Sequence, residues 1–86
     1  MDINELIAIV KKKLKNGIII ENIKVEDKSF LHVGHKGNDK KKFHLKILIN
    51  SKELSKMSRI QSNKKIYKIL DKEIKKYIHS LQILIA

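Results

Sequence analysis

Two apolar runs with no helical pattern between them do most to limit how this chain can fold. Residues 18–26 are rich in β-branched side chains, and further along the chain Phe43, Leu45, Ile47 and Ile49 alternate with His44, Lys46 and Asn50. Residues 27–42, between them, contain two glycines and show no sustained period, which predicts a loop. Because no helix fits between the two runs, we expect them to pair as an antiparallel hairpin with a long loop.

A helix is predicted before this hairpin, over residues 2–15. Apolar side chains recur there three and four positions apart, as on the buried face of a helix. Asp2 and Glu5 stand three apart, which is typical of a capping box, and Gly17 is a natural stop. This segment is therefore expected to lie as an amphipathic helix on one face of the sheet.

The second half of the chain predicts another helix and a final strand. Residues 52–57 are expected to form a short turn or a single helical turn. Ser58 can cap a long helix from Arg59 to about Ile78, and residues 81–85 alternate as a strand. The prediction is a single α+β domain, residues 1–86, with the order α-β-β-α-β, a three-stranded sheet and helices on one face.

Composition excludes several functions. The 86 residues allow one domain, and the absence of cysteine removes disulfides, thiolate catalysis and thiolate metal ligands. No P-loop, GxGxxG, GxSxG or HExxH motif is present, so we expect no freestanding enzyme. The chain has no stretch that predicts a membrane span and no N-terminal signal core, so a cytoplasmic protein is expected.

The net charge of +11 indicates an anionic partner or an acidic protein surface. On a helical wheel from Arg59 onward, one arc is apolar and contains Ile60, Ile66, Tyr67, Leu70, Ile74, Tyr77 and Ile78. The opposite arc contains Lys64, Lys65, Lys68, Lys72, Lys75 and Lys76. Three interpretations stay open: nucleic-acid contact, electrostatic steering of a partner, and a solvated face whose lysines reflect AT-rich coding.

Four histidines are the candidate ligands. His32 and His35 lie in the predicted loop, His44 on the polar side of the second strand, and His79 where the long helix meets the last strand. Imidazole binds zinc, copper and iron. A complete zinc site needs three or four ligands, so the spacing alone favours solvated histidines over a self-contained metal site.

Three stretches, in the same order along the chain, resemble the BolA-like family. Residues 25–37, VEDKSFLHVGHKG, are similar to the family's DxSxxHxGHxG loop. Residues 43–51, FHLKILINS, are similar to its HFxVxxVS strand. Residues 58–67 and 78–83 resemble its long helix and closing hALxI strand. The resemblance implies an α-β-β-α-β fold akin to a class II KH domain, in agreement with the elements predicted above.

The resemblance also implies a partner and a cofactor. BolA-like proteins pair with monothiol glutaredoxins and share a [2Fe-2S] cluster, to which the glutaredoxin cysteine and glutathione contribute ligands. On the BolA side, the matching positions are His79 in the last strand and His32 in the loop. His35 is a reserve for His32, and His44 is expected to tune or pack.

The chain departs from the family pattern at residues 54–64. The family usually has FxGxSxxxRHR there, whereas this chain has LSKMSRIQSNK, with Ser62 and Asn63 in place of the Arg-His pair. The alternative function, a nucleic-acid-binding transcriptional regulator, would use Arg59, Lys64, Lys65, Lys68 and Lys72. Whether the free protein forms a homodimer stays open.

Overall fold

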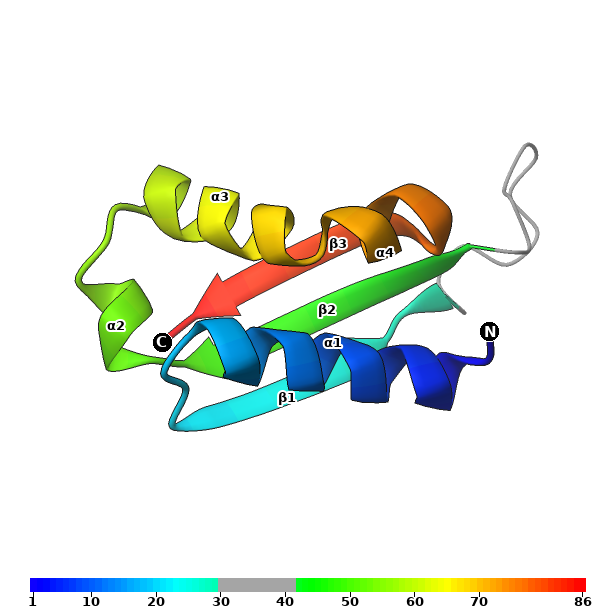
Figure 1. The fold of residues 1–86 in the computed structure, drawn as a ribbon, viewed down its shortest axis with the longest axis horizontal. Coiled ribbons are helices and arrows are strands. Elements are labelled where there is room, and N and C mark those ends of the chain that lie inside the picture. The colour runs from blue at the N-terminus through cyan, green and yellow to red at the C-terminus, as the bar shows by residue number, and fades with distance from the viewer. Residues whose placement is uncertain (30–41) are drawn as a thin grey trace.

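The computed structural model describes residues 1–29 and 42–86, and in this part of the chain the long helices pack on a three-stranded sheet (Figure 1). The elements in chain order are α1 (Ile3–Gly17), β1 (Asn22–Asp27), β2 (Phe43–Asn50), α2 (Lys52–Ser55), α3 (Arg59–Ile69), α4 (Asp71–Lys76) and β3 (Ile78–Ile85). This order confirms the predicted α+β class and the three-stranded sheet. The short helix α2 lies where a single helical turn was predicted, and the predicted long helix is divided into α3 and α4.

The strands lie in the order β1-β2-β3, with β2 in the centre. β1 and β2 are antiparallel, and Val25 lies opposite Ile47, which confirms the predicted hairpin. β3 runs parallel to β2, with Ile83 opposite Ile47. A parallel pair cannot be joined by a tight turn, so α2, α3 and α4 form the crossover between the two strands.

All the described helices of three or more turns lie on one face of the sheet (Figure 1). Side chains alternate along β2, so Leu45, Ile47 and Ile49 point to the helices and are at most 2% exposed. They meet Leu6, Val10 and Leu14 of α1 and Ile66 and Leu70 of the crossover in one hydrophobic core. Among the described residues, no helix has both the length and the apolar character needed to cross a membrane.

The first helix has Asp2 as its N-cap, which confirms one of the two bonds of the predicted capping box. The backbone N–H of Glu5 donates to Oδ1 of Asp2 at 2.8 Å, and α1 ends at Gly17. The predicted first strand began at residue 18, but β1 begins only at Asn22. Ile18 is instead the C-cap of α1 and is buried in the core, so this part of the β-branched run connects the helix to the strand.

The predicted single helix from Arg59 to about Ile78 is wrong. Leu70 leaves helical geometry with φ −97° and ψ 14°, and it separates α3 from α4. β3 then begins at Ile78, three residues earlier than predicted. In α4 the carboxylate of Glu73 is buried and faces α1, where the Lys13 ammonium donates to it at 2.7 Å. This contact therefore ties α4 to α1 within the single layer of helices.

The apolar arc predicted for this helix is also partly wrong. Ile60 is 69% exposed and Tyr67 is 42% exposed, whereas Ser62 is 2% exposed beside the core residue Ile66. Ser62 can be buried because its hydroxyl donates to the carbonyl of Arg59 at 3.0 Å. The buried face of α3 is therefore rotated relative to the purely hydrophobic arc.

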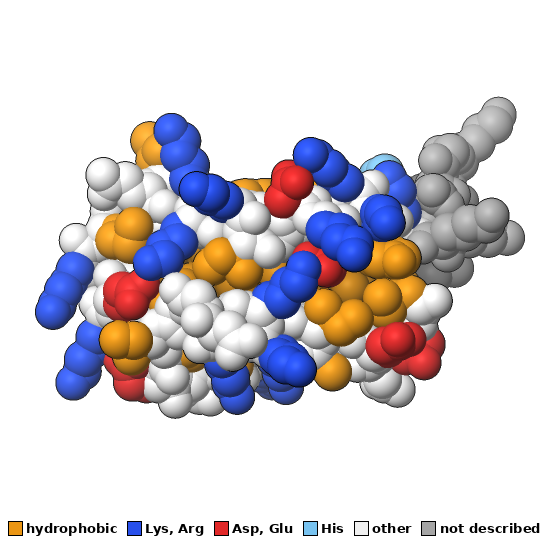
Figure 2. All heavy atoms as spheres, viewed as in Figure 1, with side chains coloured by type: hydrophobic (Ala, Val, Ile, Leu, Met, Phe, Trp, Pro, Cys, Tyr) orange, Lys and Arg blue, Asp and Glu red, His pale blue; other side chains and the backbone are white. Residues whose placement is uncertain are grey.

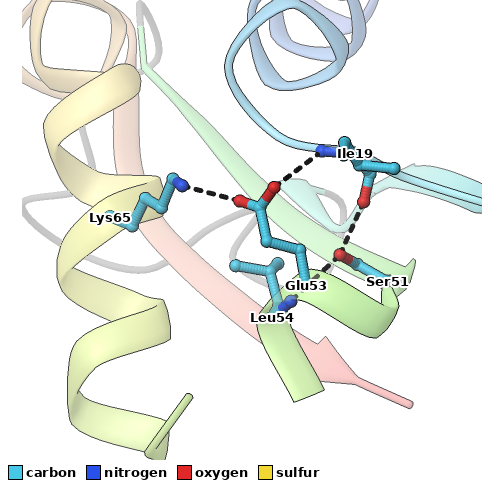
Figure 3. Close-up of polar contacts among 5 residues, drawn as sticks. All are labelled: Ile19, Ser51, Glu53, Leu54 and Lys65. Atoms are coloured by element: carbon cyan, nitrogen blue, oxygen red, sulfur yellow. Dashed lines mark hydrogen bonds and ion pairs between the residues drawn. The ribbon is translucent and has the colours of Figure 1, made fainter. Parts of the chain in front are cut away.

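Glu53 joins three elements through its carboxylate (Figure 3). Oε2 accepts from Lys65 of α3 at 2.6 Å, and Oε1 accepts from the backbone N–H of Ile19 at 3.4 Å. Beside it, the Ser51 hydroxyl donates to the carbonyl of Ile19 at 2.7 Å and accepts from the N–H of Leu54 at 3.1 Å. The short helix α2 is thus fixed both to α3 and to the connection after α1.

Candidate functional site

His79 occupies an irregular position at the start of β3. Phe43 of β2 lies opposite Ile78, and the next residue, His44, lies opposite Ser80. His79 is therefore an extra residue on β3 with no partner across the ladder, as in a β-bulge. Bulges redirect side chains, and here Ile78 is buried while His79 and Ser80, the two residues after it, are both exposed. The sequence predicted that His79 lies at this junction, but not the bulge.

Three polar side chains meet at this bulge. Nδ1 of His44 and Oγ of Ser80 are hydrogen-bonded at 2.6 Å. The ring centroids of His44 and His79 are 4.9 Å apart, and the ring planes are tilted by 52°. His44 is only 3% exposed, although it belongs to the polar set of β2. Of the two predicted roles for His44, to tune or to pack, its burial agrees with the second, and its neighbours include His79 and Ser80.

The hairpin brings residues 29 and 42, which flank the segment with His32 and His35, to the same end of the sheet as His79. The backbone N–H of His44 donates to the Ser29 hydroxyl at 3.1 Å, and the N–H of Lys28 donates to the carbonyl of His44 at 2.7 Å. His32 and His35 themselves lie outside the described residues.

Among the described residues at this site, the exposed imidazole of His79 is the side chain that could bind a metal. Among residues 1–29 and 42–86, no group of three or more His, Cys, Asp or Glu side chains is arranged to hold a metal ion. A histidine nitrogen is a known ligand of iron in iron–sulfur clusters that mix thiolate and imidazole ligation. Because His79 is exposed, the chemistry of this donor fits a cluster completed by ligands from other elements or other molecules.

The predicted basic residues lie on the helical layer. Lys64, Lys68 and Lys72 are exposed, and in the described part of the chain they join no ion pair. Lys65 differs from them, because its ammonium is paired with Glu53 at 2.6 Å. Figure 2 shows Lys and Arg side chains spread over this helix-bearing face, with hydrophobic side chains between the helices.

Arg59, the remaining predicted basic residue, lines a groove beside the edge strand β3. The groove has a volume of about 460 Å³, and its lining residues are Leu54, Ser55, Met57, Arg59, Ser62, Asn63, Gln82, Ile83, Leu84 and Ile85. Three of the positions at which the sequence departs from the BolA pattern, Leu54, Ser62 and Asn63, are among them, whereas Lys56, which replaces the family's glycine, is not. Most of these departures therefore lie at one surface feature, at the far end of β3 from His79.

Fold and site together define a small, basic α+β domain with an exposed histidine on a bulged strand. The family model described as BolA-like protein matches residues 14–86. The chain therefore belongs to the BolA-like family. No curated protein sequence gives a significant match to the chain.

Solved structures of BolA proteins are similar to this one. The BolA domain of SufE1 from Arabidopsis thaliana is 28% identical, with a TM-score of 0.77 over 91% of this chain and 86% of that chain. BolA1 from Arabidopsis thaliana is 22% identical, with a TM-score of 0.78 over 93% of this chain and 88% of that chain. BolA1 from Mus musculus is 22% identical, with a TM-score of 0.73 over 92% of this chain and 62% of that chain. The last two matches support the fold alone.

Proposed function

We propose that this protein is a non-enzymatic adaptor that binds a monothiol glutaredoxin and shares a [2Fe-2S] cluster with it. Its role would be in iron–sulfur trafficking or in iron and redox regulation. One observation carries the proposal: in a member of the BolA-like family, the bulge on β3 exposes the imidazole of His79 at the end of the sheet.

Two histidines of this chain would hold the cluster. His79 is the first, and His32 of the loop is the second, with His35 as its reserve. The glutaredoxin cysteine and a glutathione thiol would complete the ligand set. Imidazole ligation raises the reduction potential of such a cluster above that of an all-cysteine one.

Exposed lysines on the helical layer would assist the encounter with the partner. Lys64, Lys68 and Lys72 contribute to a net charge of +11, which attracts an acidic surface at long range. This steering acts on the association rate more than on the lifetime of the complex, so it would weaken with added salt.

The test is a titration of the protein with a cluster-loaded monothiol glutaredoxin, followed by visible absorption and visible circular dichroism. We expect a saturable change in the spectrum as imidazole replaces a thiolate or solvent ligand on the iron. In His79→Ala this change should be lost or moved to at least roughly 10-fold higher protein concentration.

The matched control is Gln82→Ala, which truncates another exposed side chain of β3 away from the bulge. It should titrate like the wild type. An unchanged glutaredoxin spectrum with the wild-type protein, or the same response in His79→Ala as in the wild type, would contradict the proposal.

A second candidate function is nucleic-acid binding. It is supported by the exposed lysines Lys64, Lys68 and Lys72 on α3 and α4 and by Arg59 in the groove beside β3. Lysine contacts of this kind position a protein on phosphates without reading sequence. Changing Lys64, Lys68 and Lys72 to Gln and measuring the affinity for single-stranded DNA or RNA separates this function from the adaptor.

A further inference from the structure

We propose that His44 is a positioning residue for His79, and that Ser80 holds His44 in the orientation this requires. The inference deepens the proposed function, because it rests on His79 as a cluster ligand. It assigns to His44 and Ser80 the task of limiting the orientations of the His79 imidazole before any ligand arrives.

The first support is the fixed orientation of the His44 ring. Its Nδ1 is hydrogen-bonded to Oγ of Ser80 at 2.6 Å, and the residue is 3% exposed. A buried imidazole with a short polar contact on one nitrogen keeps a single ring orientation, since turning it would leave that nitrogen unsatisfied. The ring of His44 is therefore a rigid surface within the sheet.

The second support is the position of His79 against that surface. The two ring centroids are 4.9 Å apart and the ring planes are tilted by 52°, a separation at which two rings are in contact. His79 is otherwise exposed, and an exposed histidine normally samples several side-chain rotamers. Contact with His44 removes some of these rotamers, which reduces the ordering cost when the imidazole binds iron.

The bulge explains why β3 supplies both His79 and Ser80 as neighbours of His44. In a regular strand, neighbouring residues point to opposite faces, so His79 and Ser80 could not both contact His44. The extra residue at His79 breaks this alternation, and the exposed pair His79–Ser80 flanks the same ring. Residues that orient a metal ligand in this way commonly affect metal affinity by 10- to 100-fold.

The test begins without any cluster, so that it does not depend on the glutaredoxin. The χ1 rotamer populations of His79 are measured by NMR scalar couplings in the wild-type protein, in Ser80→Ala and in His44→Ala. We expect one dominant rotamer in the wild type, and averaging over several rotamers in both variants. Dispersed amide spectra establish that each variant is folded.

The same variants are then titrated with cluster-loaded glutaredoxin. Ser80→Ala removes only a hydroxyl, and we expect the protein concentration at half-saturation to rise by roughly 10-fold. Ser80→Thr keeps the hydroxyl and should restore the wild-type value. Gln82→Ala, on the same strand but away from His44, should leave both the His79 couplings and the titration unchanged.

Two results would overturn the inference. One is an unchanged His79 rotamer distribution in Ser80→Ala, which decides the question even where His44→Ala does not fold. The other is cluster binding by Ser80→Ala that equals that of the wild type. If the wild type itself takes no cluster from glutaredoxin, the proposed function fails, while averaged couplings in Ser80→Ala would still establish the positioning contact.

Discussion

Among single residues, Glu53 makes the free energy of unfolding depend on pH. The hydrogen bond from Lys65, followed by that from the backbone N–H of Ile19, holds the pKa of the Glu53 carboxyl below its ordinary value of 4.5. A depressed pKa in the folded state means that the stabilisation is present above the unfolded value and is lost as the pH falls through the folded one. We expect Glu53→Gln to lower the free energy of unfolding at pH 7, and this difference to shrink as the pH falls below about 4.5.

Urea unfolding of the two proteins between pH 7 and pH 3 measures this difference. Glu5→Gln is the control, because in the described part of the chain the Glu5 carboxylate joins no ion pair. A Glu53→Gln penalty that stays constant down to pH 3 would show that the ion pair with Lys65 does not contribute in this way. Because the pair is partly exposed, the penalty at pH 7 should also fall with added salt.

At the scale of elements, α3 depends on its first turn. The Ser58 hydroxyl accepts from the N–H of Gln61 at 3.1 Å, and the Gln61 side chain accepts from the N–H of Ser58 at 3.4 Å, which completes a capping box. We expect Ser58→Ala to cost about 1 kcal/mol of unfolding free energy. Ser55→Ala, which removes a hydroxyl bonded to the carbonyl of Lys52, is the matched control. Equal losses in both variants, measured by urea unfolding, would contradict a special role for the cap.

Local patterns in the sequence predict most of these elements, but not how the helices turn or which faces they bury. The alternation in residues 43–49 and the caps at Asp2 and Ser58 are local signals, and the structure confirms them. The burial of Glu73 depends on its contact with Lys13 of α1, which lies 60 residues earlier in the chain, and Leu70, where the helix breaks, is buried in the core. The spacing of apolar residues within one segment cannot indicate a contact with a distant segment. For this reason the sequence predicted the helix from Arg59 and its apolar arc only in part.

In the candidate site, too, the sequence predicted one feature and could not predict another that depends on distant contacts. Family motifs identified His79, whereas its contact with His44 depends on the register of β2 against β3 and on one extra residue. For His44 the sequence indicated only a place among the polar residues of the second strand, which predicts neither its burial nor its neighbours. His32 and His35 lie outside the described residues, so their part in the site stays a prediction.

At the scale of the whole molecule, charge distinguishes the two candidate functions. A variant with Lys64, Lys68 and Lys72 changed to Gln lowers the net charge from +11 to +8, since 11 − 3 = 8, and leaves the Lys65–Glu53 pair intact. If these lysines contact phosphates, affinity for single-stranded DNA or RNA should fall, and the salt slope should drop by about one per lysine. Fluorescence anisotropy at several salt concentrations measures both.

The control changes Lys11, Lys12 and Lys15 of α1 to Gln and so reaches the same net charge of +8, since 11 − 3 = 8. Equal losses in the two variants would indicate general attraction by the net charge. No loss in either variant would exclude nucleic-acid binding through α3 and α4 and leave the adaptor as the function to pursue.

The parallel pairing of β3 with β2 has a consequence for when the site can exist. The hairpin of β1 and β2 joins strands that are adjacent in the chain, whereas the pairing of β3 with β2 spans the whole crossover of α2, α3 and α4 and is the more non-local contact. His79 and Ser80 both belong to this last strand, so the contact with His44 is absent from any chain whose C-terminal strand has not docked. The orientation of His79 by His44 would therefore exist only in fully folded molecules. Nascent or partly unfolded chains would bind the cluster iron less tightly.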